Sequence, residues 1–568
     1  MSLLNVGARA LLANQAALQT AGHNIANVNT AGYSRQSVVL QTVQGQFTGG
    51  GYIGKGVDVQ TILRNQSELL TRQATAASAV DAGDTVRMDR LRQLQEVFSG
   101  GPSGIGASIN DMMNALSDVV GSPTDLTARS VALTRMDETA TRMRDASQRL
   151  DEIAYTVAEQ LKVSMNAINS LATNIAGVNE QIARAKGNGQ PANDLLDRRD
   201  QLIRELNQHI QTSQVAADDG TVSVFVAGSQ PLVLGNKAAL LSIEDPDDFG
   251  AGSGKKVLNF QQPGSATKVE LNESMLGGGQ VAGLLRFQNN DLAEGRNLLG
   301  RMAVAISESM NTQNRLGLTL TGQPGGNLFA PINLGNASAS TANTSGATMG
   351  LQVADPTKLQ ASSYEIAFTG ANAGSVTRQS DNKVFSFTTI AGLQTIMADG
   401  GLAITDGSPP PASPFSGAAA NDRFLVNPLV GAAALFESLQ YSPTDLAAAN
   451  PVNAAMGANN SGTLQMVSLR ALSNPPGVSP PVTITFTGPN SYERSDTGAT
   501  SYSYTSGQPI TFNAAAPSKS WTVTLNGAPK DGDTITIDDA KAPAYGDWYK
   551  RDAGNASALM GLRDVPMF

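Results

Sequence analysis

A long apolar seam between Leu133 and Ala185 is the strongest structural signal in the sequence. Its members recur at alternating spacings of three and four residues, no Pro interrupts them, and only two serines break the apolar rule. This spacing places all members on one side of an α-helix, which would span about 80 Å at 1.5 Å per residue. Gly187, Gly189 and Pro191 are expected to end the helix. Because other helices must cover so long a seam, the sequence predicts a helical bundle.

Two later segments are predicted to supply partner helices for this bundle. Residues 193–210 begin with Asn193 and Asp194, either of which can cap a helix. We expect the charged run Asp197–Asp200 in this segment to form a solvated helix face. A third helix is expected to end near Asn311. The predicted buried positions of these two helices are Leu195, Leu202, Leu206 and Ile210, then Leu285, Leu292, Leu299 and Ile306.

The apolar period changes to two between and after these helices. Short alternating runs at Thr221–Gly228, Pro231–Gly235 and Lys256–Phe260 predict strands. From Gly317 onward the chain is rich in Thr, Ser, Gly and Pro, with frequent turn residues, which is typical of small β domains. One modest helix is expected near Leu435–Gln440.

A repeat lies within this β-rich region. The run Tyr364–Gly370 (YEIAFTG) matches Val482–Gly488 (VTITFTG), and each is followed by a strand ending in Asp-Gly or Asn-Gly and then by a closing strand. Asp-Gly and Asn-Gly supply the positive φ angles of tight hairpins. Chance similarity among Thr-rich strands is the alternative. The repeat predicts two β modules of one plan, with Phe368 and Phe486 in equivalent core positions.

The N-terminal segment carries another seven-residue repeat. Its large apolar members are Leu4, Leu11, Leu18 and Ile25. A surface helix of a monomer usually has charged residues on its outer face, whereas residues 1–57 contain no Asp or Glu. Packing on its own domain is one possibility, but the lack of acidic residues favours enclosure by neighbouring subunits. We expect residues 1–30 to be disordered until such neighbours cover the repeat.

Composition excludes several classes of function. Charged residues make up 15% of the chain, and the net charge of −9 includes no basic cluster that could neutralise phosphates, so no nucleic-acid binding is expected. No apolar run is long enough to predict a membrane span. With no Cys and two His, no catalytic, cofactor or metal site is predicted. The glycine-rich run Gly100–Ser108 lacks the Lys of a phosphate loop, so it is expected to separate two helices, with Ser108 capping the second.

These patterns predict a multidomain α+β fold with an N-terminal axial helix, a long-helix bundle domain and β-rich outer domains. The length of the chain is too great for one core. In chain order we expect an N-terminal axial helix, Asn/Gly strip and connector at 1–90, a helical bundle domain at 91–212 plus 280–320, a β-rich domain at 213–279 plus 321–360, a first β module at 361–430, a helix plus second β module at 431–540, and a return segment at 541–568.

The residues after the N-terminal repeat carry a family resemblance. NIANVNTAGYSRQ (Asn24–Gln36), directly after an amphipathic helix that has no acidic residue, resembles the N-terminal signature of bacterial flagellar axial proteins. NDLLDRRDQLIREL (Asn193–Leu206) and GRMAVAISESMNTQN (Gly300–Asn314) are similar to the family of hook-associated protein 1, the first hook–filament junction protein. GIGASINDMMNALSDVVGSPTDLTARS (Gly104–Ser130) also fits that family.

The resemblance implies a structural subunit without enzymatic activity. Such a subunit leaves the cell unfolded through the flagellar export apparatus and assembles as a ring of about eleven copies at the hook tip. The implied partners are further copies of itself, the hook protein, and the second and third hook-associated proteins, and the implied location is the hook–filament junction of the bacterial flagellum. The expected assembly interface comprises Leu4, Leu11, Leu18, Ile25, Asn24, Asn27, Asn29, Gly32, Tyr33, Ser34 and Arg35.

The end of the sequence departs from this family. The family ends in a long C-terminal helix that pairs with the N-terminal one, whereas only Gly554–Leu562 could form a short returning helix here. We expect either a truncation or a broken reading frame, and the segment that the family's export chaperone holds is missing. A secreted, adhesin-like surface protein without enzymatic activity is the alternative function, because Thr/Gly-rich β modules serve that purpose too.

Overall fold

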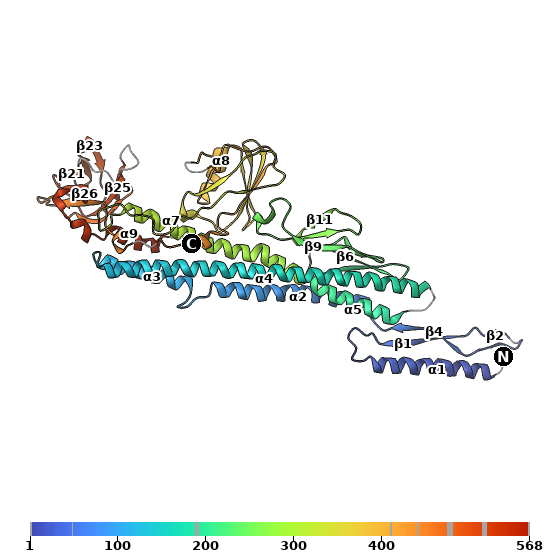
Figure 1. Cartoon of the computed structure of the whole chain (residues 1–568). Helices are drawn as coiled ribbons and strands as arrows, with labels where there is room; N and C mark the ends of the chain where they lie inside the picture. The colour runs from blue at the N-terminus through green and yellow to red at the C-terminus, as the bar shows by residue number, and fades with distance from the viewer. Residues whose placement is uncertain are drawn as a thin grey trace. The chain divides into compact units, whose positions relative to one another are not determined.

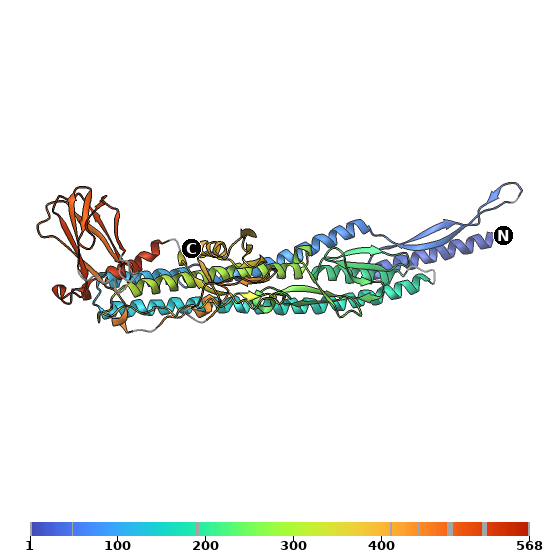
Figure 2. The same cartoon turned by 90° about the horizontal axis from the view of Figure 1, so that it is seen from above.

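The computed structural model describes residues 3–47, 49–187, 192–408, 412–439, 442–473, 481–513 and 520–565. The chain divides into two compact units, each built from segments that are distant in sequence. Unit 1 contains Met1–Leu94 and Glu152–Leu292, and unit 2 contains Gln95–Asp151 and Ala293–Phe568. Both units combine helices with antiparallel sheets, so the fold is multidomain α+β, as predicted (Figures 1 and 2).

Helix α4 (Leu126–Gly187) confirms the prediction made from the apolar seam. It is 62 residues long and contributes to both units. Leu161, Ile168 and Ile175 are fully buried, and no seam residue along the helix is exposed. One of the two seam serines, Ser164, is also buried. The seam therefore forms the core side of the helix.

Helix α2 (Glu68–Val97) was not predicted from the sequence. Only Ala79 and Gly83 are buried along it. With so few buried positions, the helix needs no apolar repeat, and the sequence therefore carries no signal for it. It packs instead through glycine against α6 (Gln280–Arg286), where a Cβ atom built on Gly283 would lie 2.1 Å from the carbonyl oxygen of Gly83. The two helices thus meet backbone to backbone, which only residues without a Cβ permit.

The predicted third helix is interrupted. A π-helical turn, Phe287–Asp291, separates α6 from α7 (Leu292–Leu316). A π turn adds one residue to the helical turn and changes the direction of its side chains. Asn289 there bonds to both backbone groups of Lys256, at 2.9 Å each, and Asp291 forms a bidentate ion pair with Arg87 on α2. The interruption therefore holds this turn to two other elements of unit 1.

Helix α7 also extends beyond Asn311, where we expected its end. Asn311 and Asn314 are buried, and their side chains bond to the loop that follows the helix. Asn311 donates to the carbonyl of Phe329 and accepts from its N–H, both at 2.9 Å, while Asn314 donates to Gly326 at 2.8 Å. Asparagine stabilises a helix interior here because the loop satisfies its amide. The predicted positions Leu285, Leu292, Leu299 and Ile306 are all buried.

Three local predictions were wrong. Helix α5 (Asn193–His209) starts after Ala192 and has no side-chain cap, because Asn193 donates instead to the carbonyl of Ile62. Ser108 lies inside α3 (Ile105–Gly121) and donates to the carbonyl of Ile105, so it does not cap that helix. In place of a helix near 435–440, the chain forms the short 3₁₀ turn Ala432–Leu435 and a β-bridge at Ser438, while Gln440 lies outside the described residues.

The strands of unit 1 form a hairpin and three small sheets. Strands predicted at Thr221–Gly228, Pro231–Gly235 and Lys256–Phe260 are observed as β6, β7 and β10. The bounds are β1 Gln36–Thr42 paired with β4 Val57–Arg64; β2 Gln46–Phe47 with β3 Tyr52–Ile53; β5 Ser213–Ala216, β6 Val222–Val226, β7 Gln230–Leu234 and β8 Lys237–Ala238 in that order; and β9 Leu240–Glu244, β10 Val257–Gln261 and β11 Lys268–Leu271, with β10 in the middle.

Unit 2 contains two β modules with the same strand order. Module 1 has the sheet β12-β18-β14-β15-β16, and module 2 has β19-β26-β21-β22-β23. The bounds in module 1 are β12 Ser338–Ala339, β13 Gly350–Val353, β14 Tyr364–Gly370, β15 Ala373–Arg378, β16 Lys383–Phe387, α8 Ile390–Asp399, β17 Leu402–Thr405 and β18 Arg423–Val426. Those in module 2 are β19 Val452–Met456, β20 Gln465–Ala471, β21 Val482–Gly488, β22 Ser491–Arg494, β23 Gly498–Ser503, β24 Pro509–Asn513, β25 Ser520–Asn526 and β26 Thr534–Asp539.

The register of the two modules also agrees, which confirms the predicted repeat. Phe368 pairs with Gly374 and Phe486 with Tyr492, and each hairpin has an irregularity directly after its Phe. Both phenylalanines are buried, at 2% and 0% exposure. In each module the backbone N–H of the Phe donates to the carbonyl of a buried Asp, which is Asp422 in the first.

A shared asparagine lies upstream of the repeat that the sequence revealed. Asn343 bonds to both backbone groups of Arg423, and Asn460 bonds in the same way to Thr534, at 2.7–2.9 Å. The carboxylates of Asp422 and Asp533, one residue before these strands, accept backbone N–H groups of the residues that follow each Asn. The modules therefore share a polar frame as well as strand order.

Two SPTDL segments meet around Arg129 in unit 2. The sequence repeats at 122–126 and 442–446, and Arg129 is 1% exposed between them. Its guanidinium donates to the carbonyls of Pro123 and Leu446, both at 2.6 Å, and of Pro443 at 3.2 Å. Burial lowers the pKa of Arg129 to about 10. The start of α4 is thereby fixed to the segment that precedes module 2.

The short helix expected at Gly554–Leu562 is present as α9 (Gly554–Gly561), which packs on α3. Asn555 is buried there, donating to the carbonyl of Ala447 at 2.7 Å and accepting from Gln313 at 2.8 Å. The segment after module 2 is therefore part of the core of unit 2.

Candidate assembly surface at the N-terminus

Helix α1 (Leu3–Ala26) lies on one face of the β1–β4 hairpin, shown in blue in Figure 1. Ala13 and Thr20 are buried against the strands, at 2% and 7% exposure. We expected residues 1–30 to be disordered until neighbours cover the repeat, whereas the structure has a helix there with one side on the hairpin.

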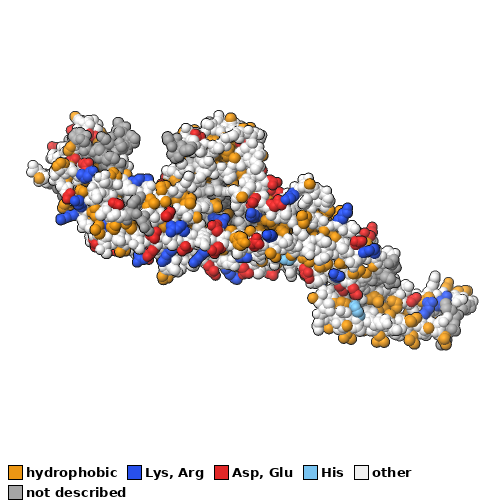
Figure 3. Space-filling model, in the orientation of Figure 1, with side chains coloured by type: hydrophobic (Ala, Val, Ile, Leu, Met, Phe, Trp, Pro, Cys, Tyr) orange, Lys and Arg blue, Asp and Glu red, His pale blue; other side chains and the backbone are white. Residues whose placement is uncertain are grey.

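The opposite side of α1 remains uncovered. We call Leu4, Leu11, Leu18 and Ile25 the N-terminal stripe. Their exposed fractions are 82%, 71%, 74% and 74%. Residues seven apart in a helix share one face, and this face is turned away from Ala13 and Thr20. Figure 3 shows hydrophobic side chains along the free edge of this helix.

Little of the N-terminal region is buried. Among the described residues up to Arg64, only Ala13, Thr20 and Gln36 are buried. The tip of the hairpin adds further exposed apolar residues: Phe47, Tyr52 and Ile53. A helix on a two-stranded hairpin has too small a core to be stable alone. The region is thus an incomplete fold with two uncovered apolar surfaces.

The Asn-rich strip fixes the turn between α1 and β1. The side chain of Asn24 donates to the carbonyl of Gln36 and accepts its N–H, both at 2.9 Å, and also accepts the hydroxyl of Tyr33 at 2.8 Å. Asn27 donates to the carbonyl of His23 at 3.0 Å. Burial, with Asp197 and Asp194 adding repulsion, raises the pKa of Tyr33 above its usual value. These amides replace backbone partners in an irregular segment.

The end of the strip contacts helix α5. The N–H of Ser34 donates to the carboxylate of Asp197 at 3.1 Å. Gly32 has φ +85°, and a Cβ atom there would lie 2.8 Å from the side chains of Gln201 and Arg204. The positive φ favours Gly at this position, whereas the flexible ends of the two side chains could move away from a Cβ. Asn29 and Arg35 are exposed.

A buried ion cluster joins the hairpin to α5. Arg64 contacts the carboxylates of Asp197 and Asp200 at 2.8 Å each, and the side chains are 9%, 9% and 17% exposed. The prediction that Asp197–Asp200 is a solvated face was wrong, because Asp197 and Arg199 are buried and Arg64 at the end of β4 bonds to the carboxylates of Asp197 and Asp200. Sequence reasoning missed the hairpin, although aromatic residues on both sides of the Gly-rich run 49–51 are typical of one.

The described residues include no group of three or more His, Asp or Glu side chains placed to hold a metal ion. None of the described helices is both long and apolar enough to cross a membrane.

Family models match most of the helical region, the first β module and α1. Residues 91–329 match the helical domain of flagellar hook-associated protein FlgK, and residues 338–428 match the D2-like domain of flagellar hook-associated protein 1. Residues 4–33 match the flagella basal body rod protein family. The fold and its N-terminal helix therefore define a structural protein of the bacterial flagellum.

Individual relatives agree with these models. Flagellar hook-associated protein 1 of Escherichia coli K12 is 30% identical over 471 residues, covering 81% of this chain and 82% of that protein. The Salmonella typhimurium LT2 protein of the same name is 31% identical over 447 residues, 76% of each chain. The structure of the flagellar hook junction protein FlgK from Burkholderia pseudomallei matches with a TM-score of 0.69 at 26% identity, over 86% of this chain and 90% of that one.

The chain belongs to the flagellar hook-associated protein 1 family. It is a structural protein of the bacterial flagellum at the hook–filament junction, and the adhesin-like alternative is not favoured.

Proposed function

We propose that the N-terminal stripe is the surface through which this protein packs against neighbouring subunits during assembly. The observation that carries the proposal is the imbalance of burial in the region up to Arg64. Three of its described side chains are buried, whereas all four stripe residues are more than 70% exposed.

The energy of burial supports this role. A large apolar side chain gains about 1.5–3 kcal/mol when it moves from water into a packed interior. The chain leaves that gain unrealised at four positions on one helix face. The face also carries no charge, so a neighbour can enclose it without removing a charged group from water. Neighbouring subunits are therefore the expected cover.

The remaining interface residues divide into two groups. Asn24, Asn27, Gly32, Tyr33 and Ser34 shape the turn and hold it on α5, so we expect them to act by positioning the stripe. Asn29 and Arg35 are exposed and are proposed to contact neighbours directly.

We propose as partners further copies of this chain in a ring of about eleven, the hook protein, and the second and third hook-associated proteins. Export in an unfolded state through the flagellar export apparatus is part of the same proposal. Family membership supports it. No catalytic activity is proposed. The six-segment division of the chain also stays a proposal, which limited proteolysis with mass spectrometry would test.

The stripe is tested by Leu11→Asp and Leu18→Asp in a strain that lacks the native protein. Gln19→Asp, an exposed position one residue from Leu18 but 100° away around the helix, is the control for added charge. We expect both Leu variants to be secreted but absent from purified hook–basal bodies, and the control to be incorporated. Incorporation of Leu11→Asp at the native level would refute the proposed role of the stripe.

Export is tested separately. Secretion of the native protein should stop in a strain without the flagellar export apparatus. Continued secretion there would show that the protein uses another route.

A further inference from the structure

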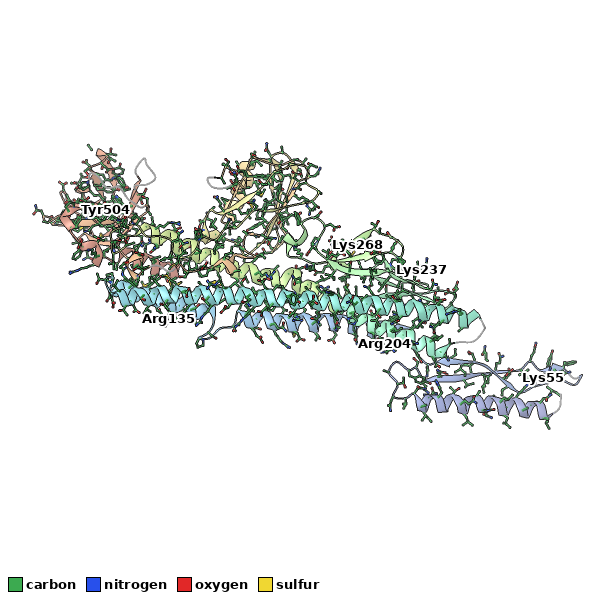
Figure 4. All side chains as sticks on the ribbon, in the orientation of Figure 1. Lys55, Arg135, Arg204, Lys237, Lys268 and Tyr504 are labelled. Carbon is green, nitrogen blue, oxygen red and sulfur yellow. The ribbon has the colours of Figure 1, made fainter. Side chains whose placement is uncertain are left out.

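Four arginines line a small cavity in unit 1. It measures about 120 Å³ and lies between the first turns of α2, the middle of α5, and strands β5 and β6. The cationic side chains are Arg64, Arg72, Arg199 and Arg204. A single water needs about 10–15 Å³ of such space, so the cavity can hold a small polyatomic group. Arg204 is labelled on α5 in Figure 4.

Arg199 is the buried member of this group and is incompletely paired. It is 6% exposed, and one Nη donates to the carbonyl of Gly220 at 2.8 Å. Among the described residues its Nε has no hydrogen-bond acceptor. The nearest carboxylate oxygen, on Asp200, lies 3.9 Å from that Nε, which is too far for a hydrogen bond.

The cavity is lined by fewer carboxylates than guanidinium groups. Glu68 and Asp200 line it, against four guanidinium groups. Asp200 bonds to Arg64, which also holds Asp197. Arg204 donates to the neutral amide oxygen of Gln201.

Among the described residues, Arg64 and Arg204 donate hydrogen bonds to side chains of α5, whereas Arg72 and Arg199 donate to no side chain, so these two are the groups left for a ligand. Arg72 lines the cavity, is exposed, and has no carboxylate partner among the described residues. Burial lowers the pKa of Arg199 below its usual value, because the surrounding carboxylates do not fully offset the loss of water.

We propose that this cavity binds one small oxyanion, a carboxylate, sulfate or phosphate group, held by Arg199 and Arg72. A guanidinium presents parallel N–H groups that match two oxygens of such an anion, and a buried charge is stabilised when it is paired. The source is either a free inorganic anion or a carboxylate side chain of a second copy of this chain. The site is independent of the N-terminal stripe, so its failure would leave the assembly role untouched.

The experiment is a calorimetric titration of the full chain with sodium sulfate at constant ionic strength. We expect saturable binding of one sulfate per chain. Arg199→Met and Arg72→Met should each weaken binding about tenfold or more, since each removes a charge-assisted hydrogen bond. Arg198→Met is the matched control, because it removes the same charge from the adjacent, exposed position of α5 and should bind normally. Arg72 is exposed, so its variant reports on the site even where Arg199→Met fails to fold.

Sedimentation velocity with and without saturating sulfate distinguishes the two possible sources of the anion. If a carboxylate of a second copy occupies the cavity, sulfate lowers self-association. If a free anion occupies it, self-association does not fall. No saturable binding by the native chain, or equal binding by the native, Arg72→Met and Arg199→Met chains, would overturn the proposal.

Discussion

The close contact between α2 and α6 predicts that Gly283→Ala lowers the stability of unit 1. The same substitution at Gly177, a helical glycine outside this contact, is predicted to raise it. In Gly283→Ala the new Cβ would lie 2.1 Å from the carbonyl oxygen of Gly83 and 3.1 Å from its Cα. The helices would have to separate by about 1 Å or more to reach ordinary contact distance. Because backbone atoms cannot rotate away, we expect the upper part of the overpacking range of about 1–3 kcal/mol.

The net effect follows from adding helix propensity. Replacing Gly by Ala inside a helix gains about 1 kcal/mol, so Gly283→Ala should lose about 2 kcal/mol of stability in unit 1. Gly177→Ala on α4 is the control, since a Cβ there meets no atom within 4 Å. That variant should gain about 1 kcal/mol.

Urea unfolding combined with hydrogen exchange provides the assay. Amide exchange in α2 and α6 should accelerate in Gly283→Ala and stay slow in Gly177→Ala. If both variants changed stability in the same direction, or if Gly283→Ala were as stable as the native chain, the backbone contact would not constrain these helices as described.

Three further predictions concern the cores of the two units. Ile168→Asp places an unpaired charge at a fully buried position and should destabilise unit 1 by several kcal/mol; a shift below about 1 kcal/mol in urea unfolding would contradict the core assignment. Arg129→Met leaves three carbonyls without their donor and should cost roughly 2–4 kcal/mol of unit 2 stability, with Arg129→Lys recovering part of it in the same unfolding measurement. Backbone hydrogen bonds, led by that from the N–H of Lys530, lower the pKa of Asp533; because the folded-state pKa is depressed, its stabilisation is present above the unfolded pKa of about 3.9 and is lost as pH falls through the folded pKa. Fluorescence of the buried Trp521 should therefore report acid unfolding of module 2, and Asp533→Asn should remove this part of the pH dependence.

The periodic spacing of apolar residues was sufficient to predict the helices and strands that have one continuously buried face. The α4 seam, the buried leucines of α7 and the two β modules all follow from apolar spacing that burial requires. The N-terminal stripe was also predicted, because its seven-residue spacing and the lack of acidic residues around it can both be read directly from the sequence. In each case the signal repeats several times along the chain.

The elements that were missed depend on single residues. Helix α2 is positioned by Gly83 and by the ion pair of Arg87, neither of which produces a period. The π turn depends on where Asn289 and Asp291 find partners, and the burial of Asp197 depends on Arg64, which is 133 residues away. The caps at Ser108 and Asn193 were mispredicted because a polar side chain can satisfy a backbone group other than the helix end, which lies inside the same helix for Ser108 and on β4 for Asn193. Such choices are decided by tertiary contacts.

Because the two β modules have the same strand order and register, strands of one module could pair wrongly with the other during folding. Strand order and register are the same, so hydrogen bonding alone would accept the wrong partner. The core side chains, however, prevent the wrong pairing. Where module 2 places Tyr492 opposite Phe486, module 1 has Gly374, at which even a Cβ would lie 2.1 Å from the carbonyl of Ala367 and 2.9 Å from the ring of Phe387. A tyrosine-bearing strand cannot enter module 1, and a glycine-bearing strand would leave a void in module 2. The different core side chains thus make each module accept only its own strands.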